Sequence, residues 1–429
     1  MIKIKSIINE LKKYNEITDY SIIEKQVKTV EQFYDLQKLE TTRKTNTDEI
    51  SVNIYTAINE NGNKYLGNAS FIVSHRISMI ALNELIKDAI YQASFVKNAY
   101  YEIPSGEGKK VYRQRNEDKD AFEILQDIAN IFFTERSERC KFNSLECFYN
   151  NVTTHLVNSR GVDYKKTTHN VQVEAIPSFR DSDKSRKYAT ELYRMFTYDD
   201  LKDYDKIKED ARNAIYDVLN RSCARKFDKS LKTNIILKGE HISQMIFELI
   251  STYNYASVYK HVNFNNIGDK IQDNPTTLLN ISLVPANKAD FFDADGVLLK
   301  DTAIIKDGEL KEYYGNNRFA YYLNLKPTGN MNTIKMPRGV TTYETMKNKP
   351  YIEILDMSGI QVDLFGDYIG GEVRLANYFD GKNTYPITAF SFSGSLKNCI
   401  NNLKLSKDLI AIPHYKGPKY ALLKDLDVL

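Results

Sequence analysis

The sequence is short of cysteine and has no tryptophan. Its 429 residues include four cysteines, and none of the spacings between them is Cys-x-x-Cys: Cys140, Cys147, Cys223 and Cys399. So few cysteines cannot build a disulfide framework, and the missing spacing removes the common redox and zinc motifs. We therefore expect reduced thiols, most of them buried.

An excess of charge of either sign is also missing. The chain has 59 Lys and Arg against 56 Asp and Glu, a formal net charge of +3. Proteins that bind nucleic acid or anionic membranes usually carry a strongly basic face. The near-neutral balance therefore argues against a nucleic-acid partner.

Long apolar runs are absent as well. The first residues, Met1–Ser6, lack the apolar core and small-residue cleavage site of a secretory signal. No stretch approaches the roughly 18 uncharged apolar residues that a transmembrane helix needs. We expect a cytoplasmic protein with no membrane partner.

Two catalytic signatures are missing too. The chain has no glycine-rich phosphate loop, and its serine cluster, Ser391–Ser395, lacks the Gly-x-Ser-x-Gly elbow of serine hydrolases. Ser393 or Ser395 as the N-cap of a following helix accounts for this cluster without catalysis.

What the chain does contain is runs of strand patterns with a few helix patterns between them. Ile50–Ile58 alternates apolar and polar residues, and Asn61-Gly62 favours a tight turn into Tyr65–Val73. Next, apolar residues recur every four positions, which predicts a helix packed on a sheet. That stripe is Ile77, Ala81, Leu85, Ala89 and Ala93.

Further patterns extend to the middle of the chain. Ala121–Phe133 fits a second helix, and residues 145–196 fit further strands until Pro177 and the polar run Arg180–Arg186 break the pattern into a loop. A long third helix fits Tyr204–Phe227. Its apolar stripe is Ile207, Ala211, Ala214, Ile215 and Val218.

The last 200 residues favour short strands separated by Gly, Asn and Pro. Asp307-Gly308 predicts a hairpin turn between Thr302–Lys306 and Glu309–Tyr313. Few regular helices are expected there beyond one that holds Phe247 and one at Ser395–Leu403. Because the strands come in runs and do not alternate with helices, the fold class is α+β and not doubly wound.

Several short motifs resemble the TldD/PmbA family of peptide-processing proteins. Each is weak alone, but their order and spacing are specific. They are Val157–Val162, Ala256–Lys260, Ile267–Lys270, Phe292–Val297, Ile304–Leu310, Thr328–Asn330 and Phe390–Leu396. The second and third are similar to the PmbA, or TldE, branch.

The resemblance implies a two-domain α+β fold. We place an N-terminal α+β domain at residues 1–200, a connecting helix at 201–230 and a β-rich C-terminal domain at 231–429.

The segment Phe247–Thr252 stands where the metallopeptidase branch of that family carries His-Glu-x-x-x-His, with two zinc-binding imidazoles and a glutamate base. Glu248 keeps the glutamate position, but Phe247 and Thr252 replace the histidines. The late cysteine of that branch is also missing from the matching tail, His414–Pro418. The resemblance therefore implies no catalytic residue and no metal in this chain, and zinc in a partner subunit.

Other residues do not supply a second metal site. His241 precedes Glu248 by seven residues, about 10 Å along one helix, so the two side chains could not share an ion. His261 could fold back, but one His and one Glu are an incomplete set of ligands.

The segment Asp293–Gly296 begins like a calcium loop, but Leu298 and Leu299 occupy its interior and Ile304 stands at position 12. We interpret it as a structural turn that shapes the wall of a cleft.

Aromatic residues cluster in the half that carries the motifs. Tyrosine combines a broad apolar ring with a polar tip, which suits the binding of extended peptide of loose sequence. The candidate substrate-binding residues are Tyr313, Tyr314, Phe319, Tyr321 and Tyr322.

The leading hypothesis is a non-catalytic, TldE/PmbA-like subunit that pairs with a TldD-like zinc metallopeptidase subunit to process or degrade unfolded or modified peptides. Two alternatives stay open. One is a homodimeric peptide-binding or scaffold protein that acts alone, and the other is a hydrolase with an unrecognised active centre.

Overall fold

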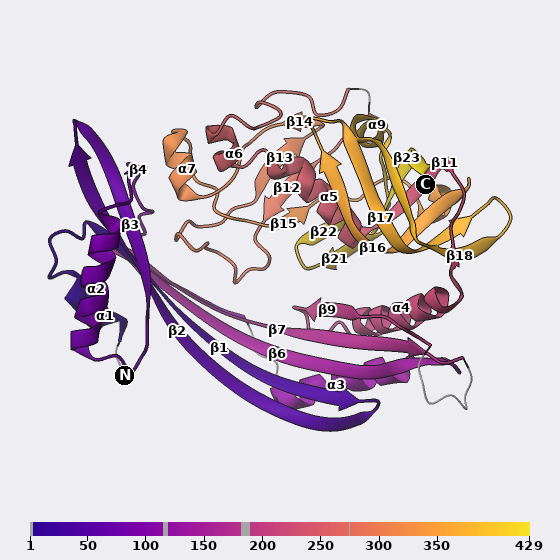
Figure 1. Cartoon of the computed structure of the whole chain (residues 1–429), viewed down its shortest axis with the longest axis horizontal. Helices are drawn as coiled ribbons and strands as arrows, with labels where there is room; N and C mark the ends of the chain where they lie inside the picture. The colour runs from indigo at the N-terminus through magenta and orange to yellow at the C-terminus, as the bar shows by residue number, and fades with distance from the viewer. Residues whose placement is uncertain (1–2, 115–118, 182–188, 274) are drawn as a thin grey trace.

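The computed structural model describes residues 3–429 apart from 115–118, 182–188 and 274. Within these residues, nine helices and three β-sheets form a mixed architecture, which confirms the α+β class (Figure 1). In the same residues no helix is both long and apolar enough to span a membrane.

The first sheet takes nine strands from the N-terminal half. They are β1 (Asp19–Asp35), β2 (Lys38–Glu60), β3 (Asn63–Val73), β4 (Asn98–Ala99), β5 (Gly108–Arg113), β6 (Cys140–Asn158), β7 (Val162–Phe179), β8 (Thr190–Glu191) and β9 (Arg194–Tyr198). Their order is β4-β3-β2-β1-β6-β7-β5, with β8 and β9 both paired to β7. Figure 1 shows the long strands β1, β2, β6 and β7 curving past the C-terminal half.

The hairpin at Asn61-Gly62 is confirmed, because both residues take positive φ (50° and 79°) between β2 and β3. However, β2 begins at Lys38, twelve residues before the predicted start. Those twelve residues pair with β1 alone and are nearly all exposed, so no apolar alternation marks them as strand.

The predicted break at Pro177 is wrong, because β7 continues through it to Phe179. Proline has no N–H to donate to a sheet and is tolerated where the ladder is irregular. Pro177 faces Phe142, where a bulge interrupts the β6 register. The predicted polar loop begins at Arg180, and its residues from 182 on lie outside the described part of the chain.

Two pairs of helices cover the ends of the first sheet. They are α1 (Ile4–Leu11) with α2 (Met79–Ala93), and α3 (Ala121–Thr134) with α4 (Tyr204–Cys223). All three predicted helices are present in this half, and the predicted stripe of α4 is buried. In α2 the buried stripe is shifted, because Leu82 and Ile86 are buried whereas Ala81 and Leu85 are half-buried. Helix α4 ends four residues before the predicted Phe227, since Arg225–Lys226 form strand β10.

The second sheet comes from the C-terminal half and is partly closed. With β10 it contains β11 (Leu231–Lys238), β16 (Tyr351–Asp363), β17 (Tyr368–Phe379), β18 (Thr384–Thr388), β19 (Phe390–Ser395), β20 (Lys404–Leu405) and β23 (Tyr420–Val428). The order is β10-β18-β17-β16-β11-β23-β19, with β20 on β23. Because β19 also pairs with β17, five strands close into a ring.

The third sheet has six short strands in the order β14-β13-β12-β15-β22-β21. They are β12 (Ile281–Val284), β13 (Thr302–Lys306), β14 (Glu309–Leu310), β15 (Thr333–Lys335), β21 (Leu409–Ile412) and β22 (Tyr415–Pro418). The turn at Asp307-Gly308 is confirmed, although β14 is shorter than predicted.

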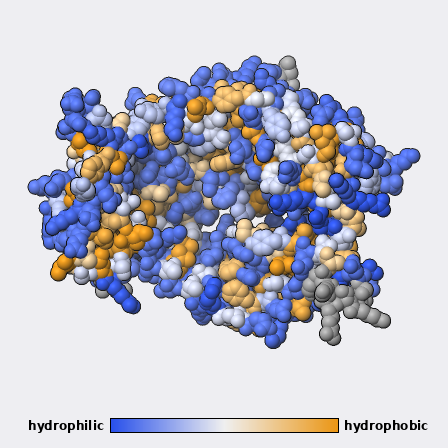
Figure 2. Space-filling model, viewed as in Figure 1, coloured by the Kyte–Doolittle hydropathy of each residue, from blue (hydrophilic) through white to orange (hydrophobic). Residues whose placement is uncertain are grey.

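Helix α5 (Gly239–Ser251) contacts strands of both C-terminal sheets and contributes to the largest core. Helix α9 (Leu396–Asn402) is confirmed, and Ser395 Oγ caps it by accepting the N–H of Asn398. Three short helices complete this half: α6 (Tyr255–Tyr259), α7 (Asn317–Tyr322) and α8 (Tyr343–Met346). Apolar and polar residues are interspersed over the face seen in Figure 2.

Candidate functional site

Helix α5 carries the degenerate motif on its outer side. The segment is helical because apolar residues recur at helical spacing and are buried: Ile242, Met245, Ile246, Leu249 and Ile250. Between them, Phe247 is 40% exposed and Glu248 is half-buried. Thr252 is the C-cap residue, and among the described residues its Oγ1 has no hydrogen-bond partner.

No metal-binding set forms around Glu248. His241 lies in the first turn of α5, where burial and the nearby Lys238 cation lower the pKa of its imidazole to about 4. In the part of the chain that the structure describes, no three His, Cys, Asp or Glu side chains are placed to hold one ion. We call the three motif positions on α5, Phe247, Glu248 and Thr252, the slot. Its side chains, a phenyl ring, a single carboxylate and a hydroxyl, do not fit the zinc of the metallopeptidase branch.

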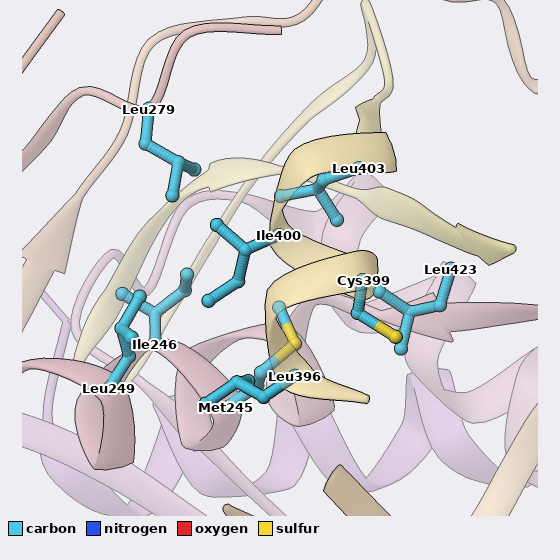
Figure 3. A pocket seen from close by; sticks show the side chains of 9 residues that line it. All are labelled: Met245, Ile246, Leu249, Leu279, Leu396, Cys399, Ile400, Leu403 and Leu423. Carbon is cyan, nitrogen blue, oxygen red and sulfur yellow. The ribbon is translucent and has the colours of Figure 1, made fainter. Parts of the chain in front are cut away.

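The inner side of α5 faces a small apolar void (Figure 3). Its volume is about 10 Å³, and its lining comes mainly from α5 and α9: Met245, Ile246, Leu249, Leu279, Leu396, Cys399, Ile400, Leu403 and Leu423. Burial raises the pKa of the Cys399 thiol to about 12, so it stays protonated. Because the described residues that line this void offer apolar side chains and one protonated thiol, it is a packing gap and not a ligand site.

The first family-like motif forms a tight turn between β6 and β7. Asn158 Oδ1 accepts the N–H groups of Arg160 (2.9 Å) and Val162 (3.0 Å), and its Nδ2 donates to Pro104 O (2.7 Å). Gly161 takes φ +85°, which favours glycine. The side-chain amide therefore fixes the turn and ties it to the segment between β4 and β5.

A second family-like motif forms a matching turn in the C-terminal half. Asp293 is 7% exposed, and its Oδ1 accepts the N–H groups of Asp295 (3.0 Å) and Val297 (2.9 Å). Its Oδ2 accepts the N–H of Asn330 (3.0 Å), which belongs to a third motif. The calcium-loop pattern is thus a carboxylate-capped turn that joins two motifs.

These two turns pack against each other, and we call this region the turn contact. A Cβ on Gly296 would lie 3.2 Å from Leu156 Cδ2 and from Val162 Cγ1. Beside them, Lys166 Nζ is 2.5 Å from Asp290 Oδ1 and donates to Phe292 O at 3.1 Å. The first sheet and the C-terminal half are therefore joined through motif residues.

Asp295 lies half-buried beside the turn contact. Burial, and then the carboxylate of Asp293, raise the pKa of Asp295 to about 6. Burial is also the main cause that raises the pKa of Tyr55 to about 12, with a contribution from Asp295. This carboxyl can therefore change charge between mildly acid and neutral solution.

Helix α7 brings two of the predicted substrate-binding residues, Tyr321 and Tyr322, against the loop after β4, whereas Phe319 packs on Tyr259 and Tyr322. Ring centroids lie 6.3 Å apart between Tyr100 and Tyr321, and 6.0 Å apart between Tyr101 and Tyr322. Tyr322 also donates its hydroxyl to Ala99 O (2.6 Å). We call these rings, with Tyr259 and the Arg318 guanidinium that stacks on three of them, the aromatic contact.

Tyr313 and Tyr314 lie apart from that contact in the C-terminal core, at 9% and 7% exposure. Burial, and then the Glu248 carboxylate, raise the pKa of Tyr314 to about 12. Tyr321 is 43% exposed, whereas Phe319 and Tyr322 are half-buried. The structure therefore does not gather the five predicted residues on one face, and their role in peptide binding stays a prediction.

Several residues that join the two halves could not be predicted from the sequence. The doublet Tyr100-Tyr101 is a visible signal, but nothing in the sequence pairs it with α7. Arg194 on β9 is another such residue: its Nη2 lies 3.3 Å from Asp217 Oδ2 on α4, and its Nη1 lies 3.1 Å from Asp356 Oδ2 on β16. Such pairings depend on long-range packing.

The C-terminal half, which carries most of the motifs, is similar to known proteins. A family model described as the PmbA/TldA metallopeptidase C-terminal domain matches residues 230–428. The metalloprotease PmbA homolog of Buchnera aphidicola subsp. Acyrthosiphon pisum (strain APS) is 30% identical over 208 residues. That match covers 44% of this chain and 45% of the relative, so it spans less than half of the relative's length.

Solved structures share the whole fold. The crystal structure of TldE from Thermococcus kodakarensis aligns with a TM-score of 0.77 over 99% of both chains, at 14% identity. A protein from Thermotoga maritima aligns with a TM-score of 0.74 over 100% of both chains, at 13% identity. At these identities the likeness establishes the fold.

Proposed function

We propose that this chain, which belongs to the TldD/PmbA family of metallopeptidase-related proteins, is a non-catalytic TldE/PmbA-like subunit of a TldD-type zinc metallopeptidase complex. The family model that matches residues 230–428 confirms the resemblance drawn from the short motifs. In the proposed complex, the partner supplies zinc, the glutamate base and the attacking water. This chain supplies walls of the substrate chamber and contacts to an unfolded or modified peptide.

One observation carries this proposal. On α5, the positions that hold imidazoles in the metallopeptidase branch are Phe247, a partly exposed ring, and Thr252, a helix C-cap. Neither side chain ligates zinc, so the half-buried Glu248 has no metal-activated water to deprotonate.

The retained motifs support the proposal in a second way. Asn158 and Asp293 use their side chains to fix two turns, and those turns hold the halves of the chain together. A chain that keeps such turns without the zinc ligands is suited to maintain a shape that another subunit binds.

The test is co-expression with a TldD-like chain from the same genome that carries an intact His-Glu-x-x-x-His. We expect one stable complex on size-exclusion chromatography that cleaves unstructured peptides. Activity should disappear when the partner's motif histidines are replaced, and should persist in the Glu248→Gln variant of this chain.

Two activity results and one assembly result would contradict the proposal. One is peptide cleavage by this chain alone, purified without the relative. The other is a complex that loses activity with Glu248→Gln while it still assembles, because that would place a working base on this chain. If the chain forms only homodimers and ignores the relative, it acts as a stand-alone binding protein.

A further inference from the structure

A basic hollow opens at the end of the first sheet that lies away from the turn contact. Its volume is about 490 Å³, and its lining is Arg136, Ser137, Glu138, Arg139, Cys140, Lys141 and Arg180. Four of these seven residues are cations and one is an anion. The excess positive charge is local, because the chain as a whole is nearly neutral.

The pairing of β6 with β7 places three of the cations, Arg139, Lys141 and Arg180, on one face of the sheet. Cys140 pairs with Phe179 and Lys141 with Ser178, and the N–H of Arg180 donates to Arg139 O at 3.0 Å. Arg139 and Arg180 are therefore directly opposite each other, on the side away from the buried Cys140. Lys141 lies two residues from Arg139 and shares that side, because side chains alternate along a strand.

Like charges placed opposite each other across a ladder are unfavourable. Burial and then the Arg180 cation lower the pKa of Lys141. Within the described residues, the side chains of Arg136, Arg139 and Lys141 have no ion pair or hydrogen bond. The nearby carboxylate of Glu191 lies on strand β8, opposite Ser178 of β7. It accepts hydrogen bonds from Asn143 (3.1 Å) and Ser178 (3.3 Å).

We propose that this hollow binds the carboxylates of an acidic peptide segment in extended conformation. Guanidinium groups match carboxylates with paired, charge-assisted hydrogen bonds. Arg139 immediately precedes β6 and Lys141 is the second residue of that strand, and in extended backbone residues two apart lie about 6.6 Å from each other, which is also the spacing of alternate side chains on an extended peptide. A segment with acidic residues at every second position therefore fits this row better than a single compact anion does.

This proposal goes beyond the subunit function and does not depend on it, because the hollow lies on the first sheet and the test uses this chain alone. A labelled peptide of alternating Glu and Ser is titrated with the purified protein, followed by fluorescence anisotropy. We expect binding that weakens about tenfold or more between about 10 mM and 150 mM salt, as the Debye length falls from about 30 Å to about 8 Å. Peptides of alternating Lys and Ser, or of Gly and Ser, should not bind.

Two charge reversals test the location. The double variant Arg136→Glu with Arg139→Glu should lower affinity for the acidic peptide at least about tenfold, since it reverses two of the four cations. Both arginines are exposed, so the fold should persist, which thermal unfolding checks. The matched control is Arg76→Glu with Arg113→Glu, two exposed arginines outside the hollow, which should change affinity less than about twofold.

Three results would overturn the proposal: equal losses in the two double variants, equal binding of the basic peptide, or no measurable binding of the acidic peptide at low salt. Inorganic pyrophosphate is the competing probe. If pyrophosphate binds and the acidic peptide does not, the hollow is a phosphate site, and the assignment to peptide is wrong.

Discussion

The slot on α5 and the turn contact are both built from family-like segments, yet they differ in how completely their polar groups are used. At the slot, Thr252 Oγ1 has no hydrogen-bond partner among the described residues, and Phe247 is 40% exposed. At the turn contact, both carboxylate oxygens of Asp293 accept backbone N–H groups, three in all.

This difference separates two reasons for keeping a motif. Satisfied side chains in a buried turn are expensive to replace, because each loss strands a buried donor or acceptor. An exposed position on a helix tolerates most residues. The turn contact therefore has a structural reason to persist in a chain without zinc ligands, whereas the slot has none, and the predictions below measure that contrast.

The largest expected effect comes from Asp293→Ala. Three backbone donors lose their acceptor, and a buried unsatisfied donor typically costs 1–3 kcal/mol, so we expect unfolding to become easier by about 3 kcal/mol after partial hydration. The matched variant at the slot, Glu248→Ala, should change stability by less than about 0.5 kcal/mol. Urea unfolding followed by circular dichroism measures both, since the chain has no tryptophan. Equal costs would remove the contrast.

The next effect is smaller and tests close packing at the turn contact. Gly296 takes φ +94°, and an added Cβ would lie 3.2 Å from Leu156 and Val162 atoms. Gly268 takes φ +95° with nothing within 4 Å of an added Cβ. Positive φ costs a non-glycine residue about 1–2 kcal/mol, so Gly268→Ala should lose about 1 kcal/mol and Gly296→Ala about 2 kcal/mol. Identical losses would show that the turns do not press on each other.

The third prediction concerns pH at the same contact. The folded pKa of Asp295, about 6, is above its usual 3.8, so the fold favours the protonated carboxyl. Stability from this group is present below about pH 4 and is lost as the pH rises through 6. Asp295→Asn should therefore stabilise the protein by about 1–2 kcal/mol at pH 7.5 and have little effect at pH 4. Thermal unfolding at both pH values checks this.

The contribution of His241 on α5 to folding stability should depend on pH in the opposite direction, which provides a control for the measurement on Asp295. Burial and the Lys238 cation lower its folded pKa to about 4, from the usual 6.5, so the fold favours the neutral imidazole. Its stabilising contribution is present above about pH 6.5 and is lost as the pH falls towards 4. If Asp295→Asn gave a loss confined to acid pH, the assignment of the raised pKa to Asp295 would be wrong.

The same contrast explains what the sequence could predict. Local chemistry was enough for the helix N-cap at Ser395, the turn at Asn61-Gly62 and the apolar stripe of α4. It was not enough for the first half of β2, whose residues are polar and exposed, because their pairing with β1 is set by the chain on either side.

The candidate site divides in the same way. The family resemblance predicted a helix around Phe247 and Glu248, and helix α5 with its buried apolar stripe confirms that helix. The sequence could not show that the Asn158 and Asp293 turns meet, or that α7 packs on Tyr100 and Tyr101, since these contacts join segments more than 100 residues apart. Helical periodicity is local, whereas a contact between two turns depends on how the sheets pack.

The smallest expected effect is at the slot, in the double variant Phe247→His with Thr252→His. Stability should change by less than about 0.5 kcal/mol, because Phe247 is partly exposed and the half-buried Thr252 Oγ1 makes no hydrogen bond that the change would break among the described residues. Residues five apart lie roughly 140° apart around a regular helix, so two imidazoles there do not converge on one ion. Ligand orientation also needs supporting hydrogen bonds, whose loss alone lowers metal affinity about 10 to 100-fold.

Elemental analysis should find no stoichiometric zinc in this variant or in the unchanged chain, and peptide cleavage should be absent. Chelator-sensitive cleavage by the double variant would show instead that α5 still holds the shape of a zinc site, and that the slot and the turn contact were kept for the same reason.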